Sequence, residues 1–224
     1  MYPEAVIFDF DGVIVDTEPI HYQAFQNLLE PLGLGYSWDE YTTRYMGFDD
    51  RDAFREAFRM HKKEIDEREL KELINLKAAY FKDVVEQGVK PYTGVLELIK
   101  ELSDKQVALA ISSGALRSDI LPILNQLNIY DSFSCIITAD DVPHSKPDPA
   151  SYMMAKQKLA ASCPEKISSN TVMYAIEDTP AGIQSAKGAG LTVIAITNSY
   201  ESDKLHQADI VINNLSQLCS GRWP

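Results

Sequence analysis

The chain of 224 residues contains only three cysteines, Cys135, Cys163 and Cys219. They are odd in number, scattered, and not at the short spacings that ligate a metal. These features argue against a disulfide framework and against a cysteine-bound metal. We therefore expect reduced thiols in a cytoplasmic protein.

Long apolar runs are also missing from the sequence. The N-terminus has no basic segment followed by an apolar stretch, and no run approaches the roughly 20 apolar residues that span a bilayer. We expect neither a signal peptide nor a membrane segment. No tandem repeat or low-complexity segment is present either.

Positive charge is scarce, since 21 Lys and Arg face 33 Asp and Glu and leave a formal net charge of -12. This balance argues against a nucleic-acid partner and against an anionic membrane surface. It does not exclude a small anionic substrate, because a bound metal and a few local cations can reverse the field within one cleft.

What the sequence does contain is a series of short apolar runs separated by helical segments. The predicted buried strands are residues 5–8, 107–111, 135–138, 171–176, 191–196 and 210–212. The predicted helices between the later strands are residues 95–103, 116–127, 149–159 and 181–189. This alternation predicts an α/β fold with a Rossmann-like parallel sheet.

A long helical block interrupts this pattern after the first strand. Thr17 and Pro19 begin a helix that continues over residues 20–32, and the chain from Trp38 to about Gln87 is helical without strand alternation. A block of roughly seventy residues is far longer than an ordinary connection. The predicted division is an α/β core domain of residues 1–15 and 91–224 and an inserted helical domain of residues 16–90.

Two carboxylates follow the first predicted strand. Asp9 and Asp11 are two residues apart, and such residues of an extended chain point to the same side. Like charges placed in this way repel unless a cation or a shared proton compensates them. Gly12 allows the backbone to turn directly after the pair. Taken alone, the pair is equally compatible with a strand end capped by solvated acids.

Polar residues also end other predicted strands. Ser112-Ser113 follows the second strand, Lys146 comes after the third, and Glu177-Asp178 follows the fourth. Because the carboxyl ends of parallel strands converge on one cleft, we expect these side chains to meet the first pair there.

The residue types point to phosphoryl transfer assisted by a metal. Several carboxylates in one small site cannot all ionise without a cation, and hard oxygen ligands suit Mg²⁺. One carboxylate can attack phosphorus covalently, and a second can move the protons. A Ser hydroxyl and a Lys ammonium can hold the phosphoryl oxygens. The residue types therefore favour an enzyme that transfers a phosphoryl group with the help of Mg²⁺.

The four motifs together resemble those of a known superfamily. In chain order, Asp9-Phe10-Asp11-Gly12-Val13, Ser112-Ser113, Lys146-Pro147 and Glu177-Asp178 resemble the motifs of the haloacid-dehalogenase-like superfamily. The resemblance covers nearly the whole chain, because the helical insertion looks like that superfamily's helical cap. The sequence is most similar to the branch that holds β-phosphoglucomutases, phosphoglycolate phosphatases and small sugar phosphatases.

The resemblance implies a role for each motif residue. Asp9 would be the nucleophile that becomes an aspartyl phosphate, and Asp11 would be the acid/base, with its main-chain carbonyl at the metal. Asp178 would bind Mg²⁺ together with Asp9, and Glu177 would be a nearby or direct metal partner. The phosphate-binding residues would be Ser112, Ser113 and Lys146.

Two residues of the helical insertion are candidates for substrate contact. The segment around His21 resembles the first cap segment of the mutases and related phosphatases, where a His helps to position the acid/base. The alternative is a His with an ordinary structural role. Gly47-Phe48-Asp49-Asp50-Arg51 could bring Arg51 to a substrate anion. Equally, it could be a helix start capped by an Asp, with Arg51 in solvent.

The resemblance implies an Mg²⁺-dependent phosphatase that hydrolyses a small phosphorylated metabolite, of the sugar phosphate or phosphoglycolate type, through an aspartyl phosphate. Three alternative functions are weighed against it. Dehalogenases of this superfamily lack the second Asp, so Asp11 argues against dehalogenation. The nearest rival is a β-phosphoglucomutase-like mutase, although Glu18-Pro19 resembles phosphatases more. The other is a non-catalytic phosphate-binding regulatory protein, although no motif position is lost.

Overall fold

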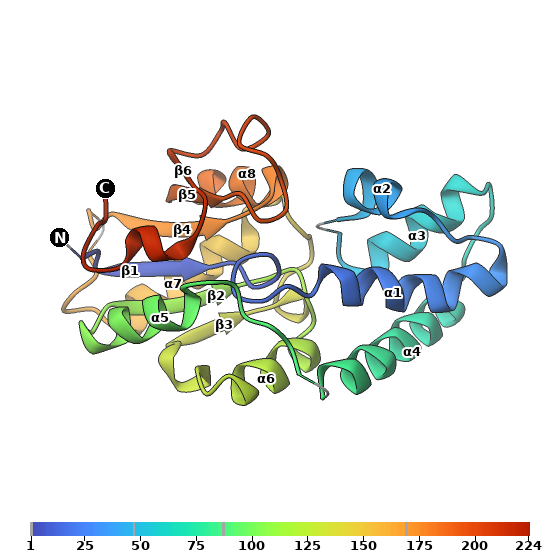
Figure 1. Ribbon diagram of the computed structural model, residues 1–224, viewed down its shortest axis with the longest axis horizontal. Coiled ribbons are helices and arrows are strands. Elements are labelled where there is room, and N and C mark those ends of the chain that lie inside the picture. Colours follow the sequence, from blue (N-terminus) through green and yellow to red (C-terminus); the bar gives the residue numbers. More distant parts are fainter. Residues whose placement is uncertain (1, 47, 87, 169) are drawn as a thin grey trace. The chain divides into compact units, whose positions relative to one another are not determined.

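The computed structural model describes residues 2–46, 48–86, 88–168 and 170–224, so Gly47 and Gln87, which belong to predicted segments, lie outside the described residues. The chain forms two compact units. One comprises Met1–Asp16 and Lys90–Pro224, and the other comprises Thr17–Val89 (Figure 1). None of the helices in the described part of the chain combines the length and apolarity needed to cross a membrane.

The first unit is built on a six-stranded parallel sheet with the strand order β3-β2-β1-β4-β5-β6. The strands are Ala5–Phe8 (β1), Ala108–Ser112 (β2), Cys135–Ile137 (β3), Met173–Glu177 (β4), Thr192–Ile196 (β5) and Ile210–Ile212 (β6). The predicted parallel α/β fold is confirmed. Strands β2 and β4 end one residue later than predicted, because ladder pairing uses the backbone and accepts the polar Ser112 and Glu177 as last residues.

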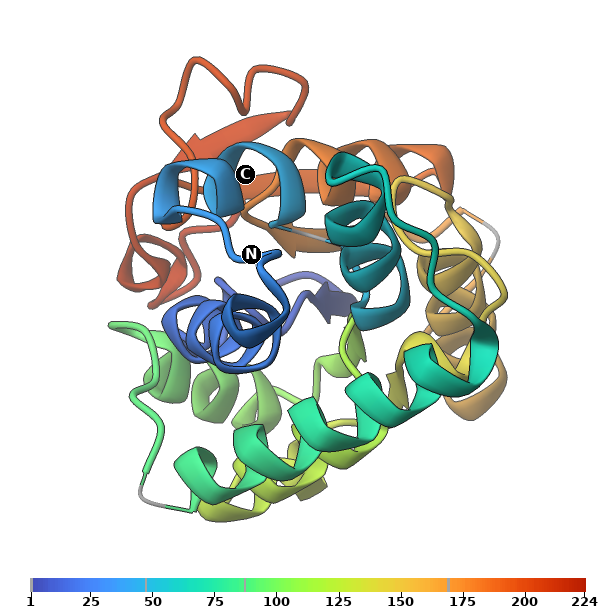
Figure 2. The ribbon, with the colours of Figure 1, turned by 90° about the vertical axis from the view of Figure 1, so that its right-hand side faces the viewer.

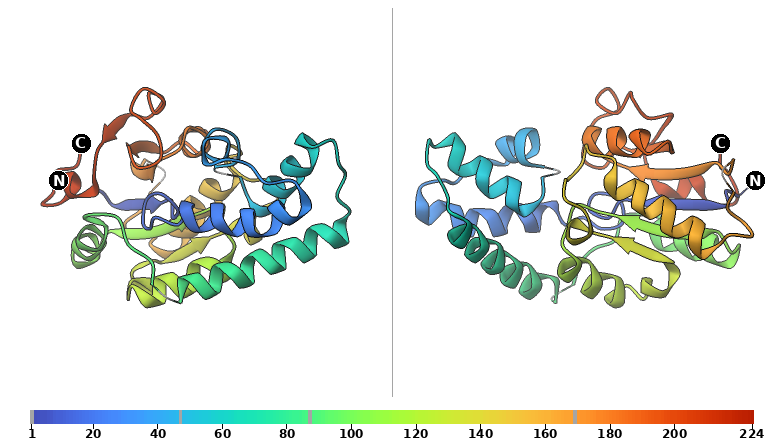
Figure 3. Two further views of the ribbon diagram at one scale, coloured as in Figure 1. Left: turned by 45° about the vertical axis from the view of Figure 1, so that its right-hand side comes forward. Right: turned by 180° about the vertical axis from the view of Figure 1, so that it is seen from behind.

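Helices cover both faces of this sheet, which explains why its strands are predominantly apolar. The helices are Val95–Asp104 (α5), Arg117–Gln126 (α6), Ala150–Ser162 (α7) and Pro180–Gly188 (α8), with short η3 (Tyr130–Ser132), η4 (Ala139–Asp141) and η5 (Leu215–Leu218). Helices α7 and α8 share one buried cluster with Ala5 and Ile7 of β1. They lie behind the sheet in Figure 1, whereas α5 and η5 lie in front, and Figure 3 shows α7 from its own side.

The position of β1 at the centre of the sheet determines where a ligand can bind. The chain passes from β1 to β2 and β3 on one side, and then to β4, β5 and β6 on the other. Strand order therefore reverses between β1 and β4, and open α/β sheets bind ligands at the carboxyl ends beside such a reversal. In this chain the expected ligand site is therefore the carboxyl end of β1, where Asp9 follows the strand.

Helices are the regular elements of the second unit among its described residues. Its elements are Glu18–Leu29 (α1), η1 (Glu30–Leu32), Trp38–Glu40 (α2), the π-helical η2 (Tyr41–Tyr45), Asp50–Met60 (α3) and Glu67–Val85 (α4) (Figure 2). Helices α1 and α3 both pack against α4. The core between them is rich in aromatic rings, such as Phe25 and Phe54, whose centroids lie 5.1 Å apart in an edge-to-face arrangement.

Candidate active site

The register of three adjacent strands brings the first site residues together. Phe8 of β1 pairs with Ile111 of β2 and with Ile176 of β4. The next residue on each strand is polar: Asp9, Ser112 and Glu177. Because side chains alternate, Asp9 points to the same face of the sheet as Ile7, and α7 covers that face. The site therefore draws on three strand ends and on α7.

The side chain of Lys146 connects these strand ends through ion pairs and a hydrogen bond. Its Nζ lies 2.6 Å from Asp9 Oδ1 and 2.6 Å from Glu177 Oε1, and it donates to the Ser112 carbonyl at 3.0 Å. Burial lowers the pKa of Lys146, but the carboxylates of Asp9 and Glu177 outweigh that effect and raise the pKa above its ordinary value. The ammonium therefore keeps its charge across the physiological range.

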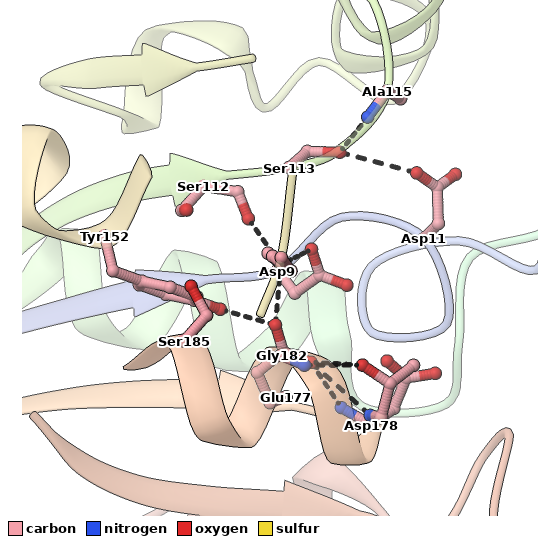
Figure 4. A network of polar contacts seen from close by, with 12 residues as sticks. Asp9, Asp11, Ser112, Ser113, Ala115, Tyr152, Glu177, Asp178, Gly182 and Ser185 are labelled. Carbon is pink, nitrogen blue, oxygen red and sulfur yellow. Dashed lines mark hydrogen bonds and ion pairs between the residues drawn. The ribbon is translucent and has the colours of Figure 1, made fainter. Parts of the chain in front are cut away.

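Glu177 is fully buried and bonded through both carboxylate oxygens. Oε1 accepts from Lys146 and from the Tyr152 hydroxyl, which is 2.8 Å away. Oε2 accepts from the backbone N–H of Asp178 at 3.1 Å and from Thr179 (Figure 4). A Cβ on Gly182 would lie 2.0 Å from this carboxylate, so the first turn of α8 needs glycine there.

Asp9, Glu177 and Asp178 form a carboxylate cluster that could hold a metal ion. Each offers an oxygen within 4.8 Å of the others, and all three residues are buried. Burial, followed by the charges of Glu177 and Asp11, raises the pKa of Asp9 well above its usual range, against the lowering effect of Lys146. A cation among these oxygens would favour the charged form of the cluster. The donor set is of the hard oxygen type that suits Mg²⁺.

Gly12 makes room for this cluster. Its φ is +78°, a conformation that glycine adopts without strain. A Cβ there would lie 1.8 Å from Asp178 Oδ2. The turn after β1 can therefore approach the end of β4 only because residue 12 has no side chain.

Asp11 lies at the edge of the site and is half-buried. The Ser113 hydroxyl donates to Asp11 Oδ2 across 3.4 Å, and it accepts from the Ala115 N–H at 3.0 Å (Figure 4). The Ser112 Oγ is buried and has no hydrogen-bond partner among the described residues. The two predicted phosphate-binding serines thus have different surroundings, with Ser113 directed at Asp11.

Comparison with known proteins identifies the family. Residues 6–196 match the model of the family described as haloacid dehalogenase-like hydrolase. The chain belongs to this family. The resemblance predicted from the four motifs is confirmed.

Two relatives are phosphatases by name. The chain is 28% identical over 211 residues to a phosphorylated carbohydrates phosphatase of Thermotoga maritima, covering 90% of this chain and 88% of that protein. It is 30% identical over 224 residues to the validoxylamine A 7'-phosphate phosphatase of Streptomyces hygroscopicus subsp. limoneus, covering 100% and 98%.

A solved structure of a β-phosphoglucomutase from Clostridium difficile has the same fold. It superposes with a TM-score of 0.84 at 24% identity and covers 97% of this chain and 93% of that one. At this level of identity, the likeness concerns the fold alone.

The structure adds polar residues that the four motifs of this haloacid dehalogenase-like chain do not include. Tyr152 and Thr179 bind Glu177, and the turn after β5 contributes Asn198 and Ser199. That turn follows the rule already used for the other strands, namely polar residues directly after an apolar run, so the sequence contained the signal. Tyr152 carried no such signal, because its inward position depends on how α7 packs.

The two remaining predicted residues, His21 and Arg51, belong to the helical unit. His21 is buried and stacks on Phe81 with 4.5 Å between ring centroids, and its Nδ1 lies 2.8 Å from Nζ of the buried Lys77. Arg51 is exposed in the first turn of α3. Asp49 caps that helix by accepting from the Asp52 N–H at 2.8 Å. A contact of either residue with substrate remains a prediction.

Proposed function

We propose that the chain is an Mg²⁺-dependent phosphatase that hydrolyses a small phosphorylated metabolite through an aspartyl phosphate on Asp9. One observation carries the proposal. The Asp9 carboxylate stands at the switch point of the sheet, 2.6 Å from the Lys146 ammonium and in one cluster with Glu177 and Asp178. A carboxylate, a cation and a metal-type oxygen cluster are the components that phosphoryl transfer needs.

The first half-reaction transfers the phosphoryl group to the protein. Lys146 and the Ser112 hydroxyl hold the phosphoryl oxygens, and a carboxylate oxygen of Asp9 attacks phosphorus. The bond between phosphorus and the ester oxygen breaks as Asp11 gives its proton to that oxygen, so the alcohol leaves neutral. The product is an acyl phosphate on Asp9 and a carboxylate on Asp11.

The second half-reaction returns Asp9 to its starting state. The Asp11 carboxylate takes a proton from a water molecule, whose oxygen attacks phosphorus. The bond between Asp9 and phosphorus breaks, inorganic phosphate leaves, and Asp11 again carries its proton. Ser113, which donates to Asp11 Oδ2, orients this acid/base.

Within the cluster, Asp9 and Asp178 would hold the metal ion directly. An Mg²⁺ ion held there would compensate the charge of the carboxylates and the charge that develops on the phosphoryl oxygens. Both oxygens of Glu177 accept hydrogen bonds from protein donors, so Glu177 primarily anchors Lys146 beside Asp9.

The names of the relatives support the choice of substrate class. One is called a phosphatase of phosphorylated carbohydrates, and the other a phosphatase of validoxylamine A 7'-phosphate. Both names describe phosphate esters of small molecules. We therefore propose a phosphorylated sugar or a similar small phosphate monoester, such as phosphoglycolate, as substrate.

A phosphate-release assay over a panel of sugar phosphates and phosphoglycolate tests the proposal. We expect inorganic phosphate from at least one compound with Mg²⁺, and none after the metal is removed with EDTA. Chromatography of the remaining sugar phosphate distinguishes hydrolysis from isomerisation. Asp131→Asn serves as a matched control, because Asp131 is exposed in η3. An isomerised sugar phosphate without phosphate release would favour a mutase, and no turnover of the whole panel would contradict the proposal.

A further inference from the structure

We infer that the turn after β5, Asn198-Ser199, positions the carboxylate of Asp178 and thereby sets the affinity of the site for its divalent cation. The inference rests on the proposed metal role of Asp178. The inference extends the site to a fourth strand end, that of β5, beside the ends of β1, β2 and β4. Strand β5 pairs with β4 on the side away from β1.

Ser199 contacts the carboxylate cluster directly. Its hydroxyl donates a hydrogen bond to Asp178 Oδ2. Asp178 is buried, with a relative exposure of 1%, whereas Ser199 is half-buried. A donor fixed on one carboxylate oxygen restricts the rotation of the whole carboxylate. Partners of this kind orient metal ligands, and their loss typically weakens metal binding by about 10- to 100-fold.

Asn198 holds the backbone segment that packs against Asp178. Its Nδ2 donates to the Gly12 carbonyl at 2.7 Å. Gly12 follows Asp11 and packs so closely that a Cβ on it would lie 1.8 Å from Asp178 Oδ2 and 2.9 Å from Ser199 Oγ. Two adjacent residues of one turn therefore fix both the backbone beside Asp11 and the side chain of Asp178.

The neighbouring Thr197 provides a matched control within the same turn. Its hydroxyl bonds Asn213 Oδ1 at 3.3 Å, and its N–H donates to the Ile212 carbonyl. These contacts anchor the turn to β6 and the residue after it. Replacing the hydroxyl by a methyl group in Thr197→Val perturbs the same turn without removing a donor to Asp178 or to Gly12.

Binding of Mn²⁺ to the metal-free full chain tests the inference independently of turnover. The free ion is followed by electron paramagnetic resonance, and Mg²⁺ is added as competitor. We expect Ser199→Ala to weaken Mn²⁺ binding about tenfold or more, Asn198→Ala to weaken it several-fold, and Thr197→Val to leave it unchanged. Circular dichroism of each variant verifies that the fold is retained, and with two independent variants the test does not depend on either one folding.

The outcomes separate this inference from the proposed function. If Asp178→Asn weakens Mn²⁺ binding but Ser199→Ala and Asn198→Ala match the wild type, the inference is wrong and the metal role of Asp178 stands. If the wild type binds neither Mn²⁺ nor Mg²⁺, or if Asp178→Asn binds as tightly as the wild type, the metal role itself fails and the inference fails with it.

Discussion

Single residues at this site act through charge compensation. The buried carboxylates of Asp9 and Glu177 share one ammonium, that of Lys146. Removing any one of these three charged groups leaves a buried charge that is not compensated. Tyr152 adds a neutral donor to this arrangement and also places its ring 4.9 Å from Lys146 Nζ. Burial and the neighbouring Glu177 charge raise the pKa of Tyr152, so its hydroxyl retains its proton and donates.

Tyr152→Phe removes the donor and keeps the ring. A buried hydrogen bond to a charged group is worth about 1.5–3 kcal/mol, and each kcal/mol shifts the midpoint of thermal unfolding by about 2–4 °C in a chain of this size. We therefore expect the midpoint measured by circular dichroism to fall by about 3–12 °C.

Tyr130→Phe is the control for this substitution, because Tyr130 is 43% exposed. Its midpoint should stay within about 2 °C of the wild type, as surface substitutions usually change stability by less than about 0.5 kcal/mol. Equal midpoints for Tyr152→Phe and the wild type would contradict the importance of the bond to Glu177.

At the scale of the element, the positions where the strands end explain how much of the site the sequence could predict. Apolar runs ending in polar residues located Asp9, Ser112 and Glu177, because parallel strands place their carboxyl ends at one edge. The same rule applied to residues 191–196 would have found Ser199. Tyr152 was beyond this rule, since the inward face of α7 depends on packing between helix and sheet rather than on local pattern.

Helix α4 shows the same limit in the helical unit. Its charge-laced sequence predicts an amphipathic helix, but Lys77 is 1% exposed and forms an ion pair with Asp50. Its Nζ also lies 4.7 Å from the centroid of the Phe25 ring. The local sequence of α4 does not show which of its lysines is buried, because Asp50, the partner of Lys77, belongs to a different helix, α3.

Lys77→Met tests this buried pair. The substitution keeps an apolar stem but leaves Asp50 with no ammonium, and breaking a buried pair in this way costs about 3–5 kcal/mol. We expect the midpoint of thermal unfolding to fall by about 6–20 °C. Lys71→Met, at an exposed position of the same helix, should have little effect.

The double variant Lys77→Met with Asp50→Asn should recover much of this loss, because it removes both charges together. If Lys77→Met is as stable as Lys71→Met, the ion pair does not stabilise the helical unit.

At the scale of the whole molecule, the fold class followed from the alternation of short apolar runs with helices and from the long helical insertion. The net charge of -12 repels anions, so an anionic substrate depends on local positive charge. Lys146, held between Asp9 and Glu177, supplies part of that charge, and a metal at the carboxylate cluster would supply the rest. The position of each donor around these groups required the tertiary structure, because the donors come from separate parts of the chain.

Trapping the phosphoenzyme is the most direct test of the role assigned to Asp9. The wild type and Asp9→Asn are mixed with Mg²⁺ and a phosphate ester that the wild type hydrolyses, quenched in acid, digested and analysed by mass spectrometry. We predict one added phosphoryl group on the wild-type peptide that contains Asp9, its loss with hydroxylamine, and no modification or turnover in Asp9→Asn. A phosphoryl group on another residue, or phosphate release by Asp9→Asn at the wild-type rate, would contradict the assignment.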